Sequence, residues 1–301
     1  MPRSPHVEQG PPAAKPLDAA LLRSWPLPLA TNGDKHSRGT VLVVGGSVRT
    51  PGAVLLSGLA ALRIGAGRLQ IATAAPAATA LAVALPEAMV APMPVDGKGS
   101  LLVAEAVAVL VELLPGADAV LIGPGMSGQT ATAEVLQEVL PRIGSSTCVV
   151  LDALALCSMD GVGSDGLRQL RDRLVVTPNR AELEQLAAAF DAFDELGEVA
   201  RSSGAVVTSF GTVAAPDGRR WCIDDAAPGL GTSGSGDALA GLVAGAAARC
   251  GDAAQATCWA TYAHHASGLR LTDRLAPLGF IAREIVDEVP FVLSALERTV
   301  A

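Results

Sequence analysis

The sequence predicts a doubly wound α/β fold, in which one mostly parallel sheet is covered by helices on both faces. Short apolar segments alternate with longer helical ones through most of the chain. The strand segments are apolar at nearly every position, as in TVLVVGG at 40–46, which indicates burial on both faces of the sheet. Glycine, proline or asparagine follows these segments, as turns after strands require.

The first elements are a short helix over Leu17–Ser24 and the buried strand at 40–46. Pro51 suits the first position of a helix, which then continues as an apolar segment to Gly65 or Gly67. The alternation continues with strand 68–73, helix 77–84, extended segment 86–92, helix 101–114, strand 118–122, helix 130–140, strand 147–151, helix 165–172, strand 174–177 and helix 180–190.

The last third of the chain departs from this alternation. A helix is predicted over 192–202, and residues 205–223 indicate an antiparallel pair of strands that turns at Asp217–Gly218. The remaining helices are predicted over 236–249, 252–271, 279–287 and 290–298. Since no linker or repeat interrupts 17–301, we expect a single domain after a flexible tail at 1–16, which holds five prolines.

Composition excludes several classes of protein. The 301 residues are half apolar and carry a formal net charge of −8, which argues against a nucleic-acid partner. The longest uncharged segment, Leu69–Pro86, contains polar residues and two prolines and does not suit a membrane span. The five cysteines are scattered without a CxxC pair, so we expect a reduced, cytoplasmic protein.

Four motifs fall at the predicted carboxyl ends of strands: Gly45-Gly46-Ser47, Gly123-Pro124-Gly125, Asp152 and Thr177-Pro178-Asn179. Each could serve turn geometry alone. In open α/β sheets, however, ligands bind in the crevice beyond these ends, and this crevice would gather all four motifs on one side.

The segment GLGTSGSGDALAG at 229–241 predicts an anion site. Glycines and small hydroxyl residues lead directly into an Ala-rich helix that starts near Asp237, and free amides at a helix start bind phosphate. The segment is not a P-loop, because no Gly-Lys-Ser/Thr follows. Asp237 is either the N-cap of this helix or a base that takes a hydroxyl proton beside an incoming phosphoryl group.

Metal ligation receives little support from the sequence. His264 and His265 are adjacent on a predicted helix and point about 100° apart, so they do not suit one metal ion. No group of His, Cys, Asp and Glu has the spacing of a metal site. We therefore expect any metal to arrive as Mg²⁺ with a nucleotide.

These residues resemble a known family, the ADP/ATP-dependent NAD(P)H-hydrate dehydratases of the ribokinase-like superfamily. The resemblance covers about Lys35 to Pro290. It is carried by GTVLVVGGS (39–47), PGAVLLSGLAALRIGAGRLQIAT (51–73), PEAM (86–89), GPG (123–125), TPN-x-x-E (177–182) and GTSGSGD (231–237). It implies a ribokinase-like fold and a repair enzyme that phosphorylates the ring hydroxyl of hydrated NADH or NADPH and then eliminates phosphate.

The resemblance also implies roles for individual residues. Asp237 would contact the hydrate and act as the catalytic base. The hydrated cofactor would be bound by Ala53, Gly125, Asn179 and Asp237. The nucleotide would be bound by Ser209, Phe210, Gly211, Thr212, Gly234, Ser235 and Gly236. The co-substrate would be ADP, or ATP, with Mg²⁺, and we expect a homo-oligomer.

The sequence departs from the family pattern at three places. Leu154 replaces the second aspartate of Asp-Ala-Asp-Ala-Leu, and Asn179 replaces the histidine of Thr-Pro-His-Pro-Gly-Glu. The Leu-Lys-Gly of the nucleotide loop is replaced within 208–212, so nucleotide contacts would depend on backbone amides and an arginine.

Two alternative functions remain. The protein could be a small-molecule kinase of the same superfamily that acts on a vitamin-precursor alcohol, or an inactive nucleotide-binding regulator.

Overall fold

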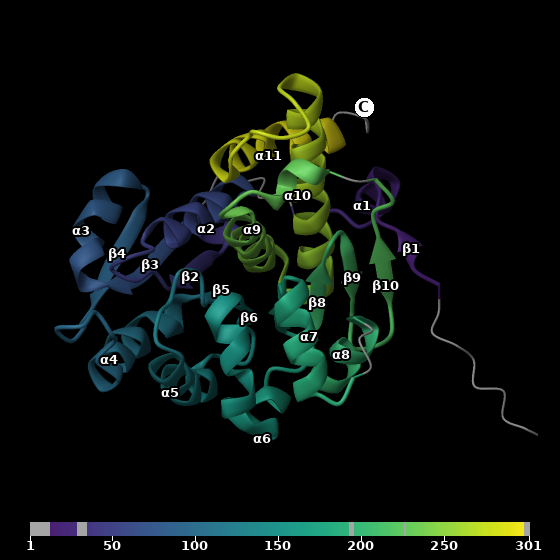
Figure 1. The fold of residues 1–301 in the computed structure, drawn as a ribbon. Coiled ribbons are helices and arrows are strands. Elements are labelled where there is room, and N and C mark those ends of the chain that lie inside the picture. The colour runs from purple at the N-terminus through teal and green to yellow at the C-terminus, as the bar shows by residue number, and fades with distance from the viewer. Residues whose placement is uncertain (1–12, 29–34, 193–195, 226, 298–301) are drawn as a thin grey trace, which may run out of the picture.

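A computed structural model describes residues 13–28, 35–192, 196–225 and 227–297. Its ten strands form one sheet in the order β1-β10-β9-β8-β7-β6-β5-β2-β3-β4 (Figure 1). The strands are β1 (Lys15–Pro16), β2 (Thr40–Val44), β3 (Arg68–Ala74), β4 (Ala88–Met93), β5 (Ala119–Ile122), β6 (Cys148–Leu151), β7 (Leu174–Val176), β8 (Val206–Ser209), β9 (Thr212–Ala214) and β10 (Arg220–Cys222). All pairs from β8 to β4 are parallel, which confirms the predicted mostly parallel sheet.

Helices cover both faces of the sheet (Figure 1). One face packs against α1 (Ala19–Ser24), α2 (Gly52–Arg63), α3 (Ala75–Ala84), α9 (Ser235–Cys250), α10 (Ala253–Arg274) and α11 (Ala282–Glu297). The other packs against α4 (Val103–Leu113), α5 (Gln129–Val139), α6 (Gly163–Arg168), α7 (Arg180–Ala189) and α8 (Leu196–Ser203). Short 3₁₀ turns occupy η1 (His36–Arg38), η2 (Leu114–Gly116), η3 (Leu140–Arg142), η4 (Ala153–Val162) and η5 (Pro228–Gly231).

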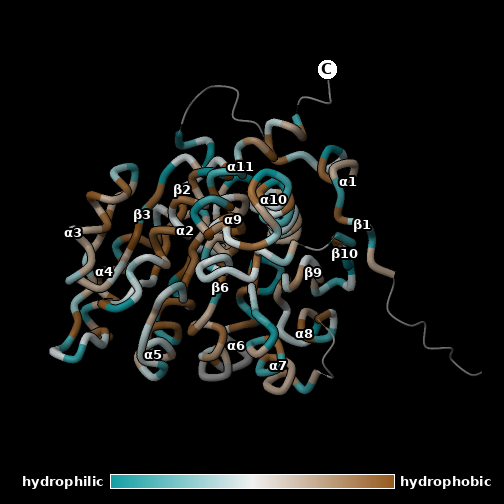
Figure 2. Tube along the Cα trace, turned by 45° about the horizontal axis from the view of Figure 1, so that its top comes forward, coloured by the Kyte–Doolittle hydropathy of each residue, from teal (hydrophilic) through white to brown (hydrophobic). Residues whose placement is uncertain are grey.

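The two-sided core explains the apolar strands. In β2, Val41 and Val43 belong to the core under α2 and α9, whereas Leu42 and Val44 belong to the opposite core. Hydrophobic segments accordingly lie along the central strands and α9, and hydrophilic ones lie mainly in the outer loops (Figure 2). In the described part of the chain, we find no helix with the length and apolar character needed to span a bilayer.

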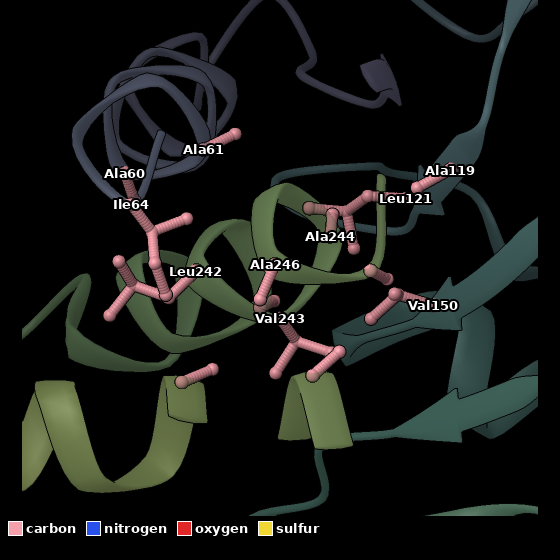
Figure 3. Packing of buried hydrophobic residues seen from close by; sticks show 14 of the residues in the cluster. Ala60, Ala61, Ile64, Ala119, Leu121, Val150, Leu242, Val243, Ala244 and Ala246 are labelled. Atoms are coloured by element: carbon pink, nitrogen blue, oxygen red, sulfur yellow. The ribbon is translucent and has the colours of Figure 1, made fainter. Parts of the chain in front are cut away.

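Helix α9 lies unusually close to α2, and this contact fixes the start of α9. A Cβ on Gly241 would lie 2.2 Å from the Ser57 carbonyl oxygen, and one on Gly245 would lie 2.5 Å from that of Ala61. Only glycine permits this approach. Around this contact, alanines and aliphatic side chains of α2 pack against α9, and those of α9 pack onto β5 and β6 (Figure 3).

Two expectations for the last third of the chain are corrected. Residues 205–223 form three strands rather than a pair: β9 and β10 make the predicted hairpin, with Gly218 in its turn, and β8 pairs with β9 through a turn at Phe210–Gly211. The segments 279–287 and 290–298 form one helix, α11, that continues through Pro290. Buried residues on both sides of Pro290 pack on the core, which offsets the hydrogen bond that proline removes.

The N-terminal segment adds one strand to the sheet. Lys15 and Pro16 form β1 beside β10, whereas the rest of the predicted 1–16 tail falls largely outside the described residues. At the other side of the sheet, the chain runs from β2 outward to β3 and β4, and then returns to place β5 beside β2. This reversal makes the β2–β5 boundary a topological switch point, where α/β proteins bind ligands.

Candidate functional site

The loops after β2 and β5 are joined at this switch point. The Gly46 N–H donates to the Pro124 carbonyl over 2.8 Å, and the Thr50 hydroxyl donates to the Gly125 carbonyl over 2.8 Å. Gly125 has a φ of +65°, and a Cβ there would lie 2.8 Å from the Ala53 Cβ. Ala53 and Gly125 are therefore neighbours, and they leave a wall of bare backbone facing the crevice.

The start of α9 forms a second wall. Its N-cap is Gly234 in the left-handed conformation, and Asp237 is the third residue of the helix. The N-cap interpretation of Asp237 is therefore wrong. The amides of Gly236 and Asp237 lie in the first turn, where helix N–H groups have no acceptor within the helix. A Cβ on Gly236 would meet nothing within 4 Å, so the space in front of this turn is open.

Ser57 ties the two walls together. Its hydroxyl lies 3.0 Å from the Ala53 carbonyl oxygen and 2.9 Å from that of Asp237, both of which accept from it. The Asp237 side chain is half-buried, and this burial raises the pKa of its carboxyl to about 6. The group is thus a stronger base than an exposed aspartate, yet it remains mostly ionised at neutral pH.

Asp152, at the carboxyl end of β6, is a second carboxyl of raised pKa. It is buried, and the Thr177 hydroxyl donates to its Oδ1 over 2.6 Å. Burial, helped by the charges of Asp237 and Glu182 and opposed by the hydrogen bond from Thr177, raises the pKa of Asp152 to about 7. The motifs after β6 and β7 are therefore joined by this hydrogen bond, and Asp237 is near enough for its charge to affect Asp152.

His264 contacts the start of α9 through Ser235. It is buried on α10, and its Nε2 lies 2.9 Å from the Ser235 Oγ and 3.1 Å from the Ser235 carbonyl oxygen. Burial lowers the pKa of His264 to about 4, so the ring is neutral at physiological pH. This geometry gives His264 a structural role. No pattern in the sequence indicates that the partner of His264 is Ser235, 29 residues away.

Asn179 and the turn after β8 lie on the opposite side of the crevice. The Asn179 side chain caps α7 by accepting from the Glu182 N–H, and Glu182 accepts in return from the Asn179 N–H. The Ser209 hydroxyl donates to the Pro178 carbonyl over 2.8 Å, which fastens the β8–β9 turn to the Asn179 segment. The Ser209 and Ser235 hydroxyls thus both have partners within the protein.

Phe210 and Arg180 project from this side of the crevice. Phe210 has a φ of +48° and is 68% exposed, and the Arg180 guanidinium carbon lies 5.1 Å from the centre of its ring. Arginine stacks on aromatic faces in this way and remains free to contact phosphate with its outer nitrogens. No sequence pattern predicts an aromatic residue at positive φ in such a turn.

Among the described residues, no group of three or more His, Cys, Asp and Glu is arranged to hold a metal ion. The oxygen ligands that Mg²⁺ prefers are nevertheless present in the crevice, in the carboxyls of Asp152 and Asp237. These residues fit a metal ion that is shared with nucleotide phosphates better than one held by the protein alone.

The fold and site suit a nucleotide-dependent enzyme of the ribokinase-like class, because an open helix start lies beside a carboxyl of raised pKa. A model of the NAD(P)H-hydrate dehydratase family matches residues 41–290. The chain belongs to this family.

Relatives and solved structures agree with this assignment. A relative from Xanthomonas campestris, named ADP-dependent (S)-NAD(P)H-hydrate dehydratase, is 44% identical over 95% of this chain and 99% of its own length. A bifunctional NAD(P)H-hydrate repair enzyme from Moorella thermoacetica is 32% identical over 94% of this chain, which spans 54% of that protein. The Bacillus subtilis ADP/ATP-dependent NAD(P)H-hydrate dehydratase, co-crystallised with ATP/Mg²⁺, shares the fold with a TM-score of 0.76 at 24% identity, over 94% and 99% of the two chains.

Proposed function

We propose that this protein restores NADH and NADPH from their hydrated forms, with ADP as the phosphoryl donor. The observation that carries the proposal is Asp237, a half-buried carboxylate of raised pKa placed at an open, anion-accepting helix start. The near full-length similarity to a protein named as an ADP-dependent (S)-NAD(P)H-hydrate dehydratase supports the choice of substrate and donor. The superfamily's alcohol kinases share the loop, but the family match does not favour them.

The chemistry proceeds in two steps. The Asp237 carboxylate takes the proton of the ring hydroxyl while the hydroxyl oxygen attacks the terminal phosphorus of ADP, and AMP leaves. The ring carbon–oxygen bond then breaks, phosphate departs with the bonding electrons, and a proton lost from the neighbouring carbon restores the double bond. Phosphate leaves far more readily than hydroxide, which is the reason to use a nucleotide.

Main-chain amides would bind the nucleotide phosphates. Gly234, Ser235 and Gly236 lie at the start of α9, and the Ser209–Thr212 turn, with Phe210 and Gly211, joins β8 to β9. Arg180 would supply the positive charge that the family's lysine provides. Mg²⁺, bound with the phosphates, would neutralise part of their charge.

The hydrated ring would lie between the walls. Ala53 and Gly125, which carry little or no side chain, would border the hydrated ring beside Asp237, and Asn179 would close the far side, where its amide nitrogen can donate. The five free cysteines suit a reducing, cytoplasmic environment, and a homo-oligomer remains our prediction for the assembly.

The test is to offer hydrated NADH or hydrated NADPH with ADP, with ATP, or with no nucleotide. We expect nicotinamide absorbance to return only with a nucleotide, faster with ADP, and with one AMP formed per cofactor restored. Accumulation of a phosphorylated substrate without absorbance would instead indicate a kinase. Nucleotide binding without any product would indicate a regulator.

A further inference from the structure

A cavity of about 500 Å³ lies beside the candidate substrate wall and has no role in the chemistry described above. Its lining comes from the loops after β2, β3, β4 and β5, including Ser47–Arg49, Pro76, Asp96–Ser100 and Ser127–Gly128. We propose that this cavity binds the adenylate half of the dinucleotide substrate, with Arg49 and Lys98 contacting its phosphates. The inference rests on the proposed function, because it assumes a hydrated dinucleotide as substrate.

The charge of the cavity is the first argument. Arg49 and Lys98 both line it, in a chain whose formal net charge is −8 and which has only three lysines. Neither cation forms an ion pair with another described residue. The one carboxylate in the lining, Asp96, accepts at Oδ1 from the Lys98 and Ser100 N–H groups. The lining therefore carries a net positive charge, as a phosphate site requires.

Arg49 and Lys98 both lie in turns that hydrogen bonds stabilise. The buried Ser47 hydroxyl accepts from the Arg49 N–H over 3.3 Å and contacts the Thr50 hydroxyl over 2.7 Å. The Asp96 carboxylate closes the turn that carries Lys98, with accepted bonds of 2.8 and 2.9 Å. Holding the main chain of both cations in place lowers the entropy lost when an anion binds.

The position of the cavity relative to the reacting ring is the second argument. Thr50 contacts both Ser47, in the cavity wall, and the Gly125 carbonyl, in the substrate wall. Ser127 and Gly128 continue directly from Gly125 into the cavity. A substrate whose ring lies at Gly125 and Asp237 can therefore extend into this space along continuous backbone.

The nucleotide donor would occupy the other end of the sheet. The Ser209–Thr212 turn follows β8, and three strands separate β8 from β2. At about 4.8 Å from one strand to the next, the carboxyl ends of β8 and β2 are about 19 Å apart. The donor's phosphates can thus meet the hydroxyl at Asp237 while the substrate's adenylate half lies in the cavity, without overlap.

Three variants test the proposal: Arg49→Ala, Lys98→Ala and the double variant. We expect KM for hydrated NADH and NADPH to rise about fivefold in each single variant and about 20-fold in the double, because charge-assisted bonds to phosphate are lost. KM for ADP and kcat should stay within about twofold of the unaltered protein. Lys98→Arg should retain the affinity, because the charge remains.

A shortened substrate sharpens the test. Hydrated reduced nicotinamide riboside has the same ring but neither the adenylate half nor any phosphate, so its KM should be the same in all variants. Arg142→Ala is the matched control. Arg142 lies in η3, which precedes β6 at the amino ends of the strands, and it forms an exposed ion pair with Glu138. If KM rises equally for both dinucleotides, the two cations contact the pyrophosphate. If KM rises only for hydrated NADPH, they contact its 2′-phosphate.

Other results would overturn the proposal. If KM for ADP rises and the KM values for hydrated NADH and NADPH do not, the cavity binds the nucleotide donor. If no constant changes, or if the shortened substrate is affected equally, the cavity does not hold the adenylate half. Titration of NADPH fluorescence with the same variants measures binding without turnover. It decides the question even if the unaltered protein fails to restore the hydrates, which would refute the proposed function alone.

Discussion

Replacing Asp237 by asparagine keeps the shape of the side chain but removes the base. General-base catalysis contributes about 10²–10⁴-fold, so restoration of hydrated NADH should slow by that factor. The affinity for ADP should hold or rise, because a negative charge near the phosphates is lost. In the unaltered protein, kcat/KM should fall as the pH drops through about 6, where Asp237 becomes protonated, and Asp237→Asn should lose this dependence.

The same substitution should stabilise the protein. The pKa of Asp237 is about 6 in the folded protein against an ordinary value of 3.8, so the folded state binds the proton more tightly and stability falls as pH rises between these values. A shift of about 2 pH units corresponds to about 3 kcal/mol, which partial exposure of the carboxyl reduces to about 1–2 kcal/mol. Asp237→Asn should recover this free energy fully above pH 6 and not at all below pH 3.8.

The assays are single-turnover absorbance for the rate and urea unfolding at pH 8 and pH 3.5 for stability. Asp252→Asn is the matched control, because Asp252 is a true N-cap on α10 that accepts from the Gln255 N–H, and asparagine caps equally well. It should change neither rate nor stability by a measurable amount. An Asp237→Asn enzyme that retains near-normal turnover would refute the assignment of the base, and one that is less stable at pH 8 would refute the electrostatic argument.

Three further substitutions test the architecture of the site. Gly236→Val should weaken ADP binding at least tenfold in a calorimetric titration with little loss of stability, since its side chain would occupy open space where phosphate binds; Gly116→Val, equally open but remote, should change neither. Gly241→Ala should lower the free energy of unfolding by about 2 kcal/mol or more in urea, because its Cβ would lie 2.2 Å from the Ser57 carbonyl oxygen. Arg180→Ala should raise KM for ADP about fivefold without changing kcat, and unchanged ADP kinetics would show that Arg180 does not replace the family's lysine.

The sequence predicted the sheet and the crevice well because those features depend on local patterns. Continuous apolar strands and glycines at strand ends are visible in any window of the chain. Local patterns could not distinguish Asp237 from Asp252, since each is an aspartate at the start of a helix, and only the structure shows which one caps. The passage of α11 through Pro290 likewise depends on packing against residues distant in sequence.

The contacts of Ser57 have a consequence for how the enzyme can respond to its ligands. Because one hydroxyl joins the Ala53 and Asp237 carbonyls, and α9 touches α2 through bare glycine backbone, the wall at Ala53 and the helix start that carries Asp237 form a single rigid unit. Any adjustment that shuts water out during phosphoryl transfer must then come from across the crevice. The exposed turn that carries Phe210 is the part of the site with room to move, so the enzyme would keep its base stationary and bring the donor side to it.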